Sequence, residues 1–274
     1  MGMMINFKQV KKNLIFNKKE SLNYLNKRVF LKNSVKKNFF KLDKDYLSNL
    51  HVKKKIKDTF KPNLFQLTFL HKLILKFKRT TILELGVGWS THVMSAALME
   101  NKIKYIKDIE NLRFSNSFEI HSVDNYKKYI IKTKNILRGE QKKIVKFHYS
   151  KVDTTVYKKR ICTEYRFLPH INPDLIFIDG PSQYETLGKV NNLSTGHPDY
   201  APMSCDLLKI EPYLRPGTFV VIDGRTLNAL FLKNFLFRNW DYFFYKEIDF
   251  HILFLNGPTL GKLNIKQLKF YNLS

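Results

Sequence analysis

From Thr81 onward, short apolar runs rich in strand-forming residues alternate with longer segments whose apolar positions recur at helical spacing. The apolar runs predict strands at residues 81–85, 118–123, 144–149, 175–179, 219–223, 241–248 and 251–255. The helical segments between them are 90–100, 126–138, 203–214 and 226–238. Strands that alternate with helices predict a parallel sheet with helices on both faces. The last two strands leave no room for a helix between them, so we expect them to pair as a hairpin.

The chain before this alternation has a different pattern, in which lysine clusters separate short apolar groups. Over residues 1–60 this pattern predicts irregular basic helices that pack loosely on the main domain or extend from it. Residues 63–77 have apolar positions at helical spacing and predict a helix that leads into the domain. We therefore expect a lysine-rich extension over residues 1–62 and an α/β domain over residues 63–274.

The positive charge is concentrated in the first part of the chain. The formal net charge is +25, and residues 1–79, with 21 basic and 4 acidic side chains, contribute +17 of it. Such a segment is typical of binding to nucleic acid or to an anionic surface. However, lysine outnumbers arginine 39 to 9, although arginine is the better ligand for phosphates and bases. An AT-rich coding sequence explains the same composition, so both interpretations stay open.

Cysteine content and hydropathy indicate the compartment. Cys162 and Cys205 lie far apart without a CxxC or Cys/His pairing, which argues against a disulfide framework or a structural zinc site. No apolar run approaches the ~20 residues of a membrane-spanning helix. The first residues lack the charged-then-apolar order of a signal peptide. We expect a soluble, cytoplasmic protein.

The stretch LELGVGWST at residues 83–91 places two glycines one residue apart between a predicted strand and a predicted helix. Glycine permits either a tight turn or the close approach of a ligand to the backbone. Ser90 is a plausible N-cap of the helix, whose free N–H groups attract anions. A dinucleotide-binding loop has a third glycine where this chain has Thr91. Glu84 beside the loop would repel a pyrophosphate but attract an ammonium group, which favours S-adenosylmethionine (SAM) over NAD.

This loop resembles the first motif of class I SAM-dependent methyltransferases, an acidic residue followed by spaced glycines and a Ser or Thr. The resemblance covers roughly residues 63–260. It implies a Rossmann-like, mostly parallel seven-stranded sheet of order 3-2-1-4-5-7-6, with strand 7 antiparallel. It also implies that Glu84, Gly86 and Gly88 line the methionine end of the cofactor, and we expect Ser90 to belong to the same loop.

Asp124 ends the second predicted strand, where a carboxylate is placed to bind the ribose hydroxyls. The alternative is that Asp124 or Asn125 caps the following helix. Asp124 lies 16 positions further from the glycines than a dinucleotide fingerprint requires, about 36 instead of ~20. This spacing predicts an extended loop over residues 101–117.

Two further strands also end in aspartate. Asp179 precedes Gly180 and Pro181, and the strand resembles the fourth motif of small-molecule methyltransferases rather than the Asn-Pro-Pro-aromatic type. We expect Asp179 to serve both the cofactor and catalysis. Asp223 ends the next strand, and two neighbouring carboxylates can share a divalent ion. Metal-dependent catechol-type enzymes have Asn where this chain has Gly224, so we assign no metal.

Three other residues are candidates for roles around the acceptor. Arg225 would either clamp a carboxylate or phosphate of the substrate or cap the following helix. Residues 188–204 predict a polar loop over the acceptor site, and within it His197 is the candidate general base. His148, on the third strand, is expected to pack in the sheet or to line the adenine pocket.

The sequence thus predicts a SAM-dependent methyltransferase that acts on an oxygen of a small-molecule or sugar-like acceptor. Two alternatives remain. The basic arm can indicate an RNA-binding protein or RNA methyltransferase, and the glycine loop can indicate an NAD-binding oxidoreductase. We expect residues 1–79 to bind nucleic acid or an anionic surface weakly and without specificity.

Overall fold

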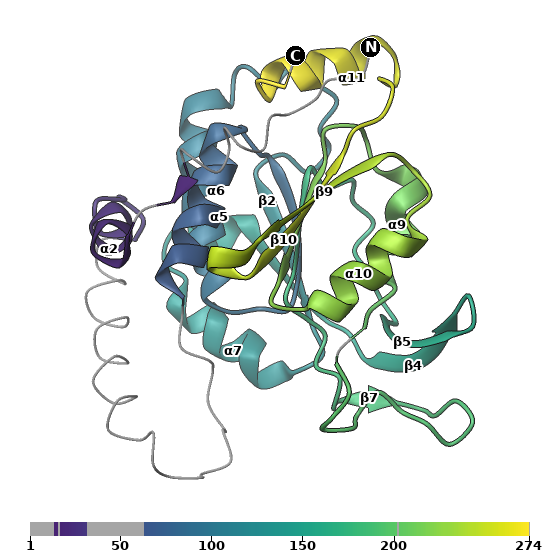
Figure 1. The fold of residues 1–274 in the computed structure, drawn as a ribbon. Coiled ribbons are helices and arrows are strands. Elements are labelled where there is room, and N and C mark those ends of the chain that lie inside the picture. Colours follow the sequence, from purple (N-terminus) through teal and green to yellow (C-terminus); the bar gives the residue numbers. More distant parts are fainter. Residues whose placement is uncertain (1–13, 16, 32–62, 202, 274) are drawn as a thin grey trace.

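The computed structural model describes residues 14–15, 17–31, 63–201 and 203–273 (Figure 1). Its strands are β1 (Thr81–Leu85), β2 (Glu119–Asp124), β3 (Val145–Tyr149), β4 (Val152–Tyr157), β5 (Arg160–Tyr165), β6 (Leu175–Ile178), β7 (Thr186–Leu187), β8 (Phe219–Asp223), β9 (Trp240–Tyr245) and β10 (Phe250–Leu255). Its α-helices are α2 (Lys18–Asn26), α5 (Leu64–Lys76), α6 (Trp89–Tyr105), α7 (Lys127–Ile136), α8 (Gln141–Ile144), α9 (Asp206–Ile210), α10 (Thr226–Phe235) and α11 (Gly261–Phe270). Short 3₁₀ turns follow α9 and β9 at Glu211–Tyr213 and Lys246–Ile248.

Seven of the strands form one sheet in the order β3-β2-β1-β6-β8-β10-β9. All neighbouring pairs are parallel except those of β10, which runs antiparallel to both β8 and β9. Counted along this sheet, the order is the predicted 3-2-1-4-5-7-6, and the Rossmann-like fold is confirmed. Because Leu85 lies opposite both Val123 and Ile178, the ends of β1, β2 and β6 are level at one edge.

Alternation of side chains along the strands divides the core between the two faces of the sheet. Ile82 and Phe177 pack toward one face with residues of α5 and α6, whereas Leu83 and Ile176 pack toward the other with residues of α9 and α10. Figure 1 shows these helix pairs on opposite sides of the sheet. Both faces of the central strands are covered, which explains their nearly continuous apolar sequences.

A second, three-stranded sheet in the order β5-β4-β7 was not predicted. The chain enters it directly from the carboxyl end of β3, and β7 follows the loop after β6, so this sheet lies beside the carboxyl edge of the main sheet (Figure 1). β4 and β5 form a hairpin whose turn residues, Lys158 and Lys159, have φ of 44° and 66°. Hairpin turns of this left-handed kind favour Asn and Gly, so two lysines gave no turn signal.

The described part of the N-terminal segment packs tightly on the domain. Leu25 and Leu31 are fully buried in one apolar cluster with residues of α5 and α6. Tyr24 hydrogen-bonds His71 of α5 at 3.1 Å, and Arg28 pairs with Glu100 of α6 at 3.3 Å. The expectation of loose packing is therefore wrong for this stretch. The remaining residues of the predicted extension lie outside the described part of the chain.

The opposite, amino edge of the sheet is closed by α11, a helix that the sequence analysis did not predict. Arg79, fully buried before β1, donates to the carbonyls of Phe77 and Gly217 at 2.7 and 2.9 Å. Its guanidinium lies 3.9 Å from the ring centre of Tyr271, and the Tyr271 hydroxyl donates to Asp174 at 2.9 Å. These contacts fix the α11 end of the chain beneath β1 and β6.

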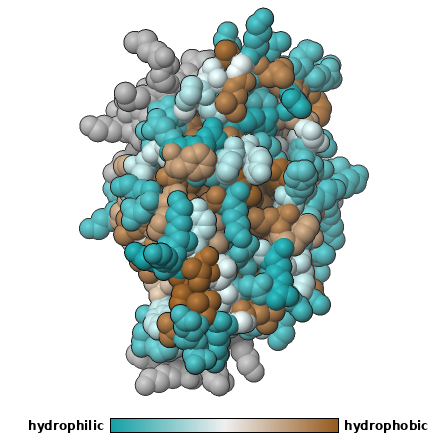
Figure 2. Space-filling view, turned by 90° about the vertical axis from the view of Figure 1, so that its right-hand side faces the viewer, coloured by the Kyte–Doolittle hydropathy of each residue, from teal (hydrophilic) through white to brown (hydrophobic). Residues whose placement is uncertain are grey.

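Figure 2 shows the side of the molecule that lies to the right in Figure 1, where apolar side chains are interspersed among hydrophilic ones. Within the described residues, no helix combines the length and the apolar character needed to cross a membrane.

Candidate active site

The two glycines after β1 have different structural reasons. Gly86 has φ +94°, and a Cβ placed on it would lie 2.8 Å from the backbone of Asp179 and of Gly180. It is therefore required for a turn and for close contact with the loop after β6. A Cβ on Gly88 would meet nothing within 4 Å. Protein packing does not explain Gly88, and its open backbone is where a ligand can approach.

Helix α6 begins one residue earlier than the sequence suggested, and the prediction of Ser90 as N-cap is wrong. The N-cap is Gly88, because the turn is so short that helical geometry starts at Trp89. The Ser90 hydroxyl instead donates to the Glu84 carboxylate at 2.6 Å. The Gly88 N–H is bound by the Thr91 hydroxyl at 3.1 Å.

Glu84 is fully buried within β1 and fixes this loop from below. Its carboxylate accepts hydrogen bonds from Ser90, Thr91 and Ser122, each at 2.6 Å. Burial raises the pKa of Glu84 to about 7, although the three hydroxyls oppose the shift. The side chain thus joins β1, β2 and the start of α6 into one rigid unit. Its predicted attraction for a ligand ammonium group stays a prediction.

Asp124 connects the end of β2 to the same loop. One carboxylate oxygen accepts the Val87 N–H at 2.9 Å and the other accepts the Tyr126 N–H at 2.6 Å. Burial raises its pKa to about 6. Helix α7 has Tyr126 as N-cap without a side-chain cap, so neither Asp124 nor Asn125 is its N-cap residue. The contact of Asp124 with ribose remains a prediction, since its carboxylate is seen to bind the glycine loop after β1 and the Tyr126 N–H.

Asp179 and Asp223 end the adjacent parallel strands β6 and β8, where Ile178 lies opposite Ile222. Asp179 is exposed, and no described residue donates a hydrogen bond to its carboxylate. Desolvation by the surrounding protein nevertheless raises its pKa to about 6. Burial and the neighbouring Asp179 raise the pKa of Asp223 to about 7. The two carboxylates therefore influence one another's protonation near neutral pH.

Asp223 is held by a residue of α5, a helix for which the sequence analysis predicted no role in the site. Gln66 of α5 donates to Asp223 at 2.6 Å and to the carbonyl of Ile248 at 2.9 Å. Sequence reasoning missed Gln66, because it lies 157 positions from Asp223 in a helix that was read only as an entry to the domain.

The side chain of Arg225 contacts the loop after β6, and its predicted contact with a carboxylate or phosphate of the substrate remains a prediction. Its guanidinium donates to the carbonyls of Asp179 and Pro181, at 2.6 and 3.1 Å. It is the N-cap of α10, but its side chain makes no cap hydrogen bond. The arginine thus holds the loop after β6 in place and lies close enough to lower the pKa of Asp179.

Neither of the two candidate histidines, His148 and His197, contacts these carboxylates among the described residues. His197 is exposed, accepts the Asp199 N–H at 3.1 Å and contacts the Tyr200 ring. All of these contacts lie within its own loop. His148 stacks on His121 in the main sheet, with ring centres 5.3 Å apart and a hydrogen bond of 3.2 Å. Its packing role is therefore seen, and its contact with adenine remains a prediction.

The carboxyl edge of the sheet is rich in carboxylates. No cluster of three or more His, Cys, Asp or Glu side chains suited to a metal ion occurs in the described part of the chain. Carboxylates at the ends of β2, β6 and β8 share this edge, together with the buried Glu84, and the guanidinium of Arg225 is committed to carbonyls. A cationic ligand beside Gly88 is consistent with this charge.

The sheet order, the glycine turn after the first strand and the carboxylates at the following strand ends define an α/β protein of the Rossmann-like class. A family model described as a methyltransferase domain matches residues 83–224, just over half of the chain. The chain belongs to this family, and the protein is a class I SAM-dependent methyltransferase.

Comparisons with solved structures and with curated sequences add little to this assignment. A solved structure of the O-methyltransferase from Bacillus cereus in complex with S-adenosylhomocysteine (SAH) is similar at 13% sequence identity and a TM-score of 0.39, over 90% of this chain and 94% of that one. No curated protein sequence matches the chain significantly. The assignment rests on the family match and on the sheet order.

Proposed function

We propose that the protein transfers the methyl group of SAM to an oxygen of a small-molecule or sugar-like acceptor. The observation that carries the proposal is the pair Asp179 and Asp223. These carboxylates end adjacent strands, and their pKa values lie at about 6 and about 7. A general base is most effective when its pKa is near the working pH. A hydroxyl acceptor needs such a base, since it must lose a proton as its oxygen attacks.

The cofactor is proposed to bind along the loop after β1. Gly86 and Ser90 shape this loop, and Gly88 gives access to its backbone. Asp124 is proposed to accept hydrogen bonds from the ribose, and Glu84 to attract the ammonium group. When bound, SAM supplies a methyl group on a positively charged sulfur, and the carboxylates at this edge favour that charge.

Asp179 is the first candidate for the base. A Cβ on Gly86 would lie 2.8 Å from the carbonyl carbon of Asp179, so this residue adjoins the cofactor loop directly. Its carboxylate is open to solvent and unbonded among the described residues, which leaves it free to take the proton of an acceptor. Gln66 holds Asp223 by a hydrogen bond. Asp223 is therefore proposed to be the group with which Asp179 shares a proton. His197 is the second candidate, on the basis of its loop.

The test is a set of acceptors offered with SAM, including phenols, catechols, sugars, carboxylic acids and amines, with SAH formation as the readout. Nuclear magnetic resonance of the product distinguishes an O-methyl from an N-methyl group. Asp179→Asn should lower turnover about 10²-fold or more, with intact SAH binding. The exposed Asp108→Asn is the control for loss of one acidic charge.

Several outcomes would overturn the proposal. Methylation confined to nitrogen or to RNA would refute the acceptor class. Full activity of Asp179→Asn together with an inactive, folded His197→Ala would move the base to the loop at residues 188–204. Activity that disappears with a chelator and returns with Mg²⁺ would restore the metal interpretation of Asp179 and Asp223.

A further inference from the structure

Tyr165, the last residue of β5, carries a buried hydroxyl without a partner. Its side chain is 3% exposed and packs in the apolar cluster that includes Leu85, Val123 and Ile178, near the ends of β1, β2 and β6. Among the residues that the structure describes, no hydrogen-bond partner is found for its hydroxyl oxygen. A buried hydroxyl without a partner destabilises the folded protein, so its retention calls for a function outside the apolar core.

This hydroxyl lies at the contact between the two loops of the candidate site. A Cβ placed on Gly180 would lie 2.8 Å from the Tyr165 oxygen and equally 2.8 Å from the Cα and N of Gly86. Asp124, Asp179 and Arg225 are near enough to influence the pKa of Tyr165. The second sheet thus brings a hydrogen-bonding group to the contact between the loop after β1 and the loop after β6.

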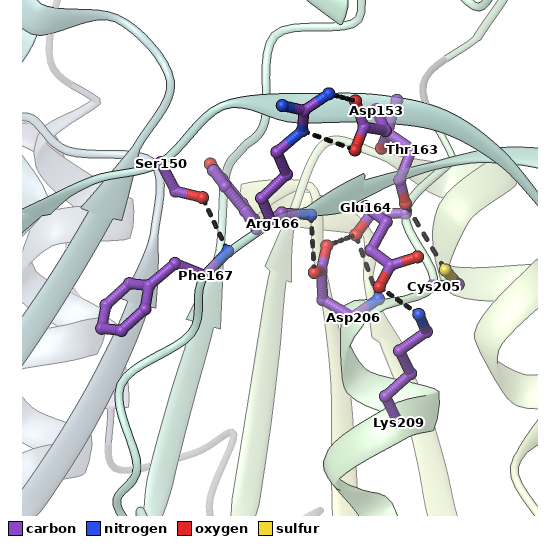
Figure 3. Close-up of polar contacts among 11 residues, drawn as sticks. Ser150, Asp153, Thr163, Glu164, Arg166, Phe167, Cys205, Asp206 and Lys209 are labelled. Carbon is purple, nitrogen blue, oxygen red and sulfur yellow. Dashed lines mark hydrogen bonds and ion pairs between the residues drawn. The ribbon is translucent and has the colours of Figure 1, made fainter. Parts of the chain in front are cut away.

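Hydrogen bonds and ion pairs fix the chain on both sides of Tyr165, which limits the positions that its side chain can take. Its N–H donates to Asp206 at 2.9 Å. As Figure 3 shows, the adjacent Glu164 pairs with Lys209, and Arg166 makes two hydrogen bonds of 2.7 Å with Asp153. Two residues beyond Tyr165 along the chain, the Phe167 N–H donates to the Ser150 hydroxyl at 2.9 Å (Figure 3). Such support on both sides is how proteins preorganise a binding group.

We propose that Tyr165 is a cofactor-binding residue whose hydroxyl forms a hydrogen bond with bound SAM or SAH. The inference rests on the cofactor site proposed above. Burial holds the pKa of Tyr165 well above its ordinary value, so the hydroxyl keeps its proton and acts as a donor rather than as a base. The bond supplies the partner that the hydroxyl lacks in the unliganded protein.

The proposal predicts opposite effects on stability and on affinity, which a purely structural tyrosine would not produce. In Tyr165→Phe, the unpaired hydroxyl is gone, so the melting temperature of the unliganded protein should be unchanged or higher. The affinity for SAH, measured by calorimetry, should fall about 10-fold, as for one lost hydrogen bond. Tyr157→Phe is the matched control, because Tyr157 lies at the other end of the same hairpin and should leave both quantities unchanged.

Each other outcome is decisive. Unchanged SAH affinity in Tyr165→Phe overturns the proposal. A lower affinity with a lower melting temperature of the unliganded variant also overturns it, because the hydroxyl would then be bonded before the cofactor arrives. If the wild-type protein binds neither SAM nor SAH, the cofactor site itself is refuted, which is a different failure.

Discussion

Gly86 and Gly180 lie against one another so closely that a Cβ on either would be 2.8 Å from backbone atoms of the other. One glycine follows β1 and the other follows β6, which are neighbours in the sheet. The glycine loop after β1 and the loop that carries Asp179 are therefore one packed unit. A change at either glycine is transmitted to both.

Gly86→Ala should destabilise the folded protein. The substitution meets both a φ of +94° and backbone atoms at 2.8 Å, and it should lower the free energy of unfolding by about 2–5 kcal/mol. Chemical denaturation measures the change. A Gly86→Ala variant as stable as the wild type would contradict the close contact.

Gly88→Val should have the opposite profile. No described residue lies within 4 Å of a Cβ at this position, so the protein should fold with only the small cost of a valine at the N-cap of α6. If the cofactor approaches the backbone here, calorimetry should find SAM affinity reduced at least 10-fold. Gly139→Val is the control for a glycine without neighbours elsewhere on the surface, although its φ of +50° adds some strain. Normal SAM affinity in Gly88→Val would remove Gly88 from the site.

SAM affinity should increase between pH 5.5 and pH 8. The pKa values of Asp124 and Asp179 are raised to about 6 and that of Asp223 to about 7, so these groups lose their protons across this interval. Ionised carboxylates attract a cation and protonated ones do not. The increase should be larger for SAM than for SAH, which lacks the charged sulfur. Calorimetry at both pH values measures it, and an affinity independent of pH would argue against carboxylates at the cofactor.

Asp206→Asn should become stabilising as the pH rises. Burial raises the pKa of Asp206 to about 7, above the ordinary value of an unfolded aspartate. The protonated Asp206 side chain therefore stabilises the folded protein at low pH, and this stability is lost as the pH rises through the folded pKa. The asparagine does not titrate and keeps the acceptor for the Tyr165 N–H. At pH 8 it should exceed the wild type by ~2–4 kcal/mol, and the difference should shrink as the pH falls and disappear below about pH 4, the unfolded pKa. A difference that does not change with pH would exclude this linkage.

The basic segment should bind RNA weakly and without sequence preference. Residues 1–79 carry a net +17, and binding through lysines and phosphates weakens steeply with salt. Fluorescence anisotropy with unrelated RNA sequences at low and at high salt measures this. Tight binding that persists at high salt would instead support the RNA alternative.

The strands of the main sheet and its final hairpin were predictable because they are short apolar runs at regular spacing, whereas their order followed from the resemblance to class I methyltransferases. The smaller sheet was not predictable, because β4 and β5 are only partly buried and their turn at Lys158 and Lys159 lacks glycine. The predicted loop over residues 101–117 was too long, since α6 continues to Tyr105. Local spacing does not show where a helix will end when tertiary packing decides it.

At the site, the sequence indicated the residues at strand ends but not their partners. Asp124, Asp179 and Asp223 were found because a polar residue interrupts an apolar strand. Gln66 and Tyr165 were missed because each reaches the site from an element outside the βα pattern. Such contacts depend on the packing of distant elements, for which a single sequence has no local signal.

The enclosure of Arg79 has a consequence for synthesis of the protein. This cation is buried by Tyr271, which the ribosome adds after nearly all of the described chain. Until then, the amino edge of β1 has neither its aromatic cover nor the hydroxyl that binds Asp174. A nascent chain that already contains the whole sheet is therefore still open at that edge, and protection from proteases and chaperones there should come only at the last step of folding.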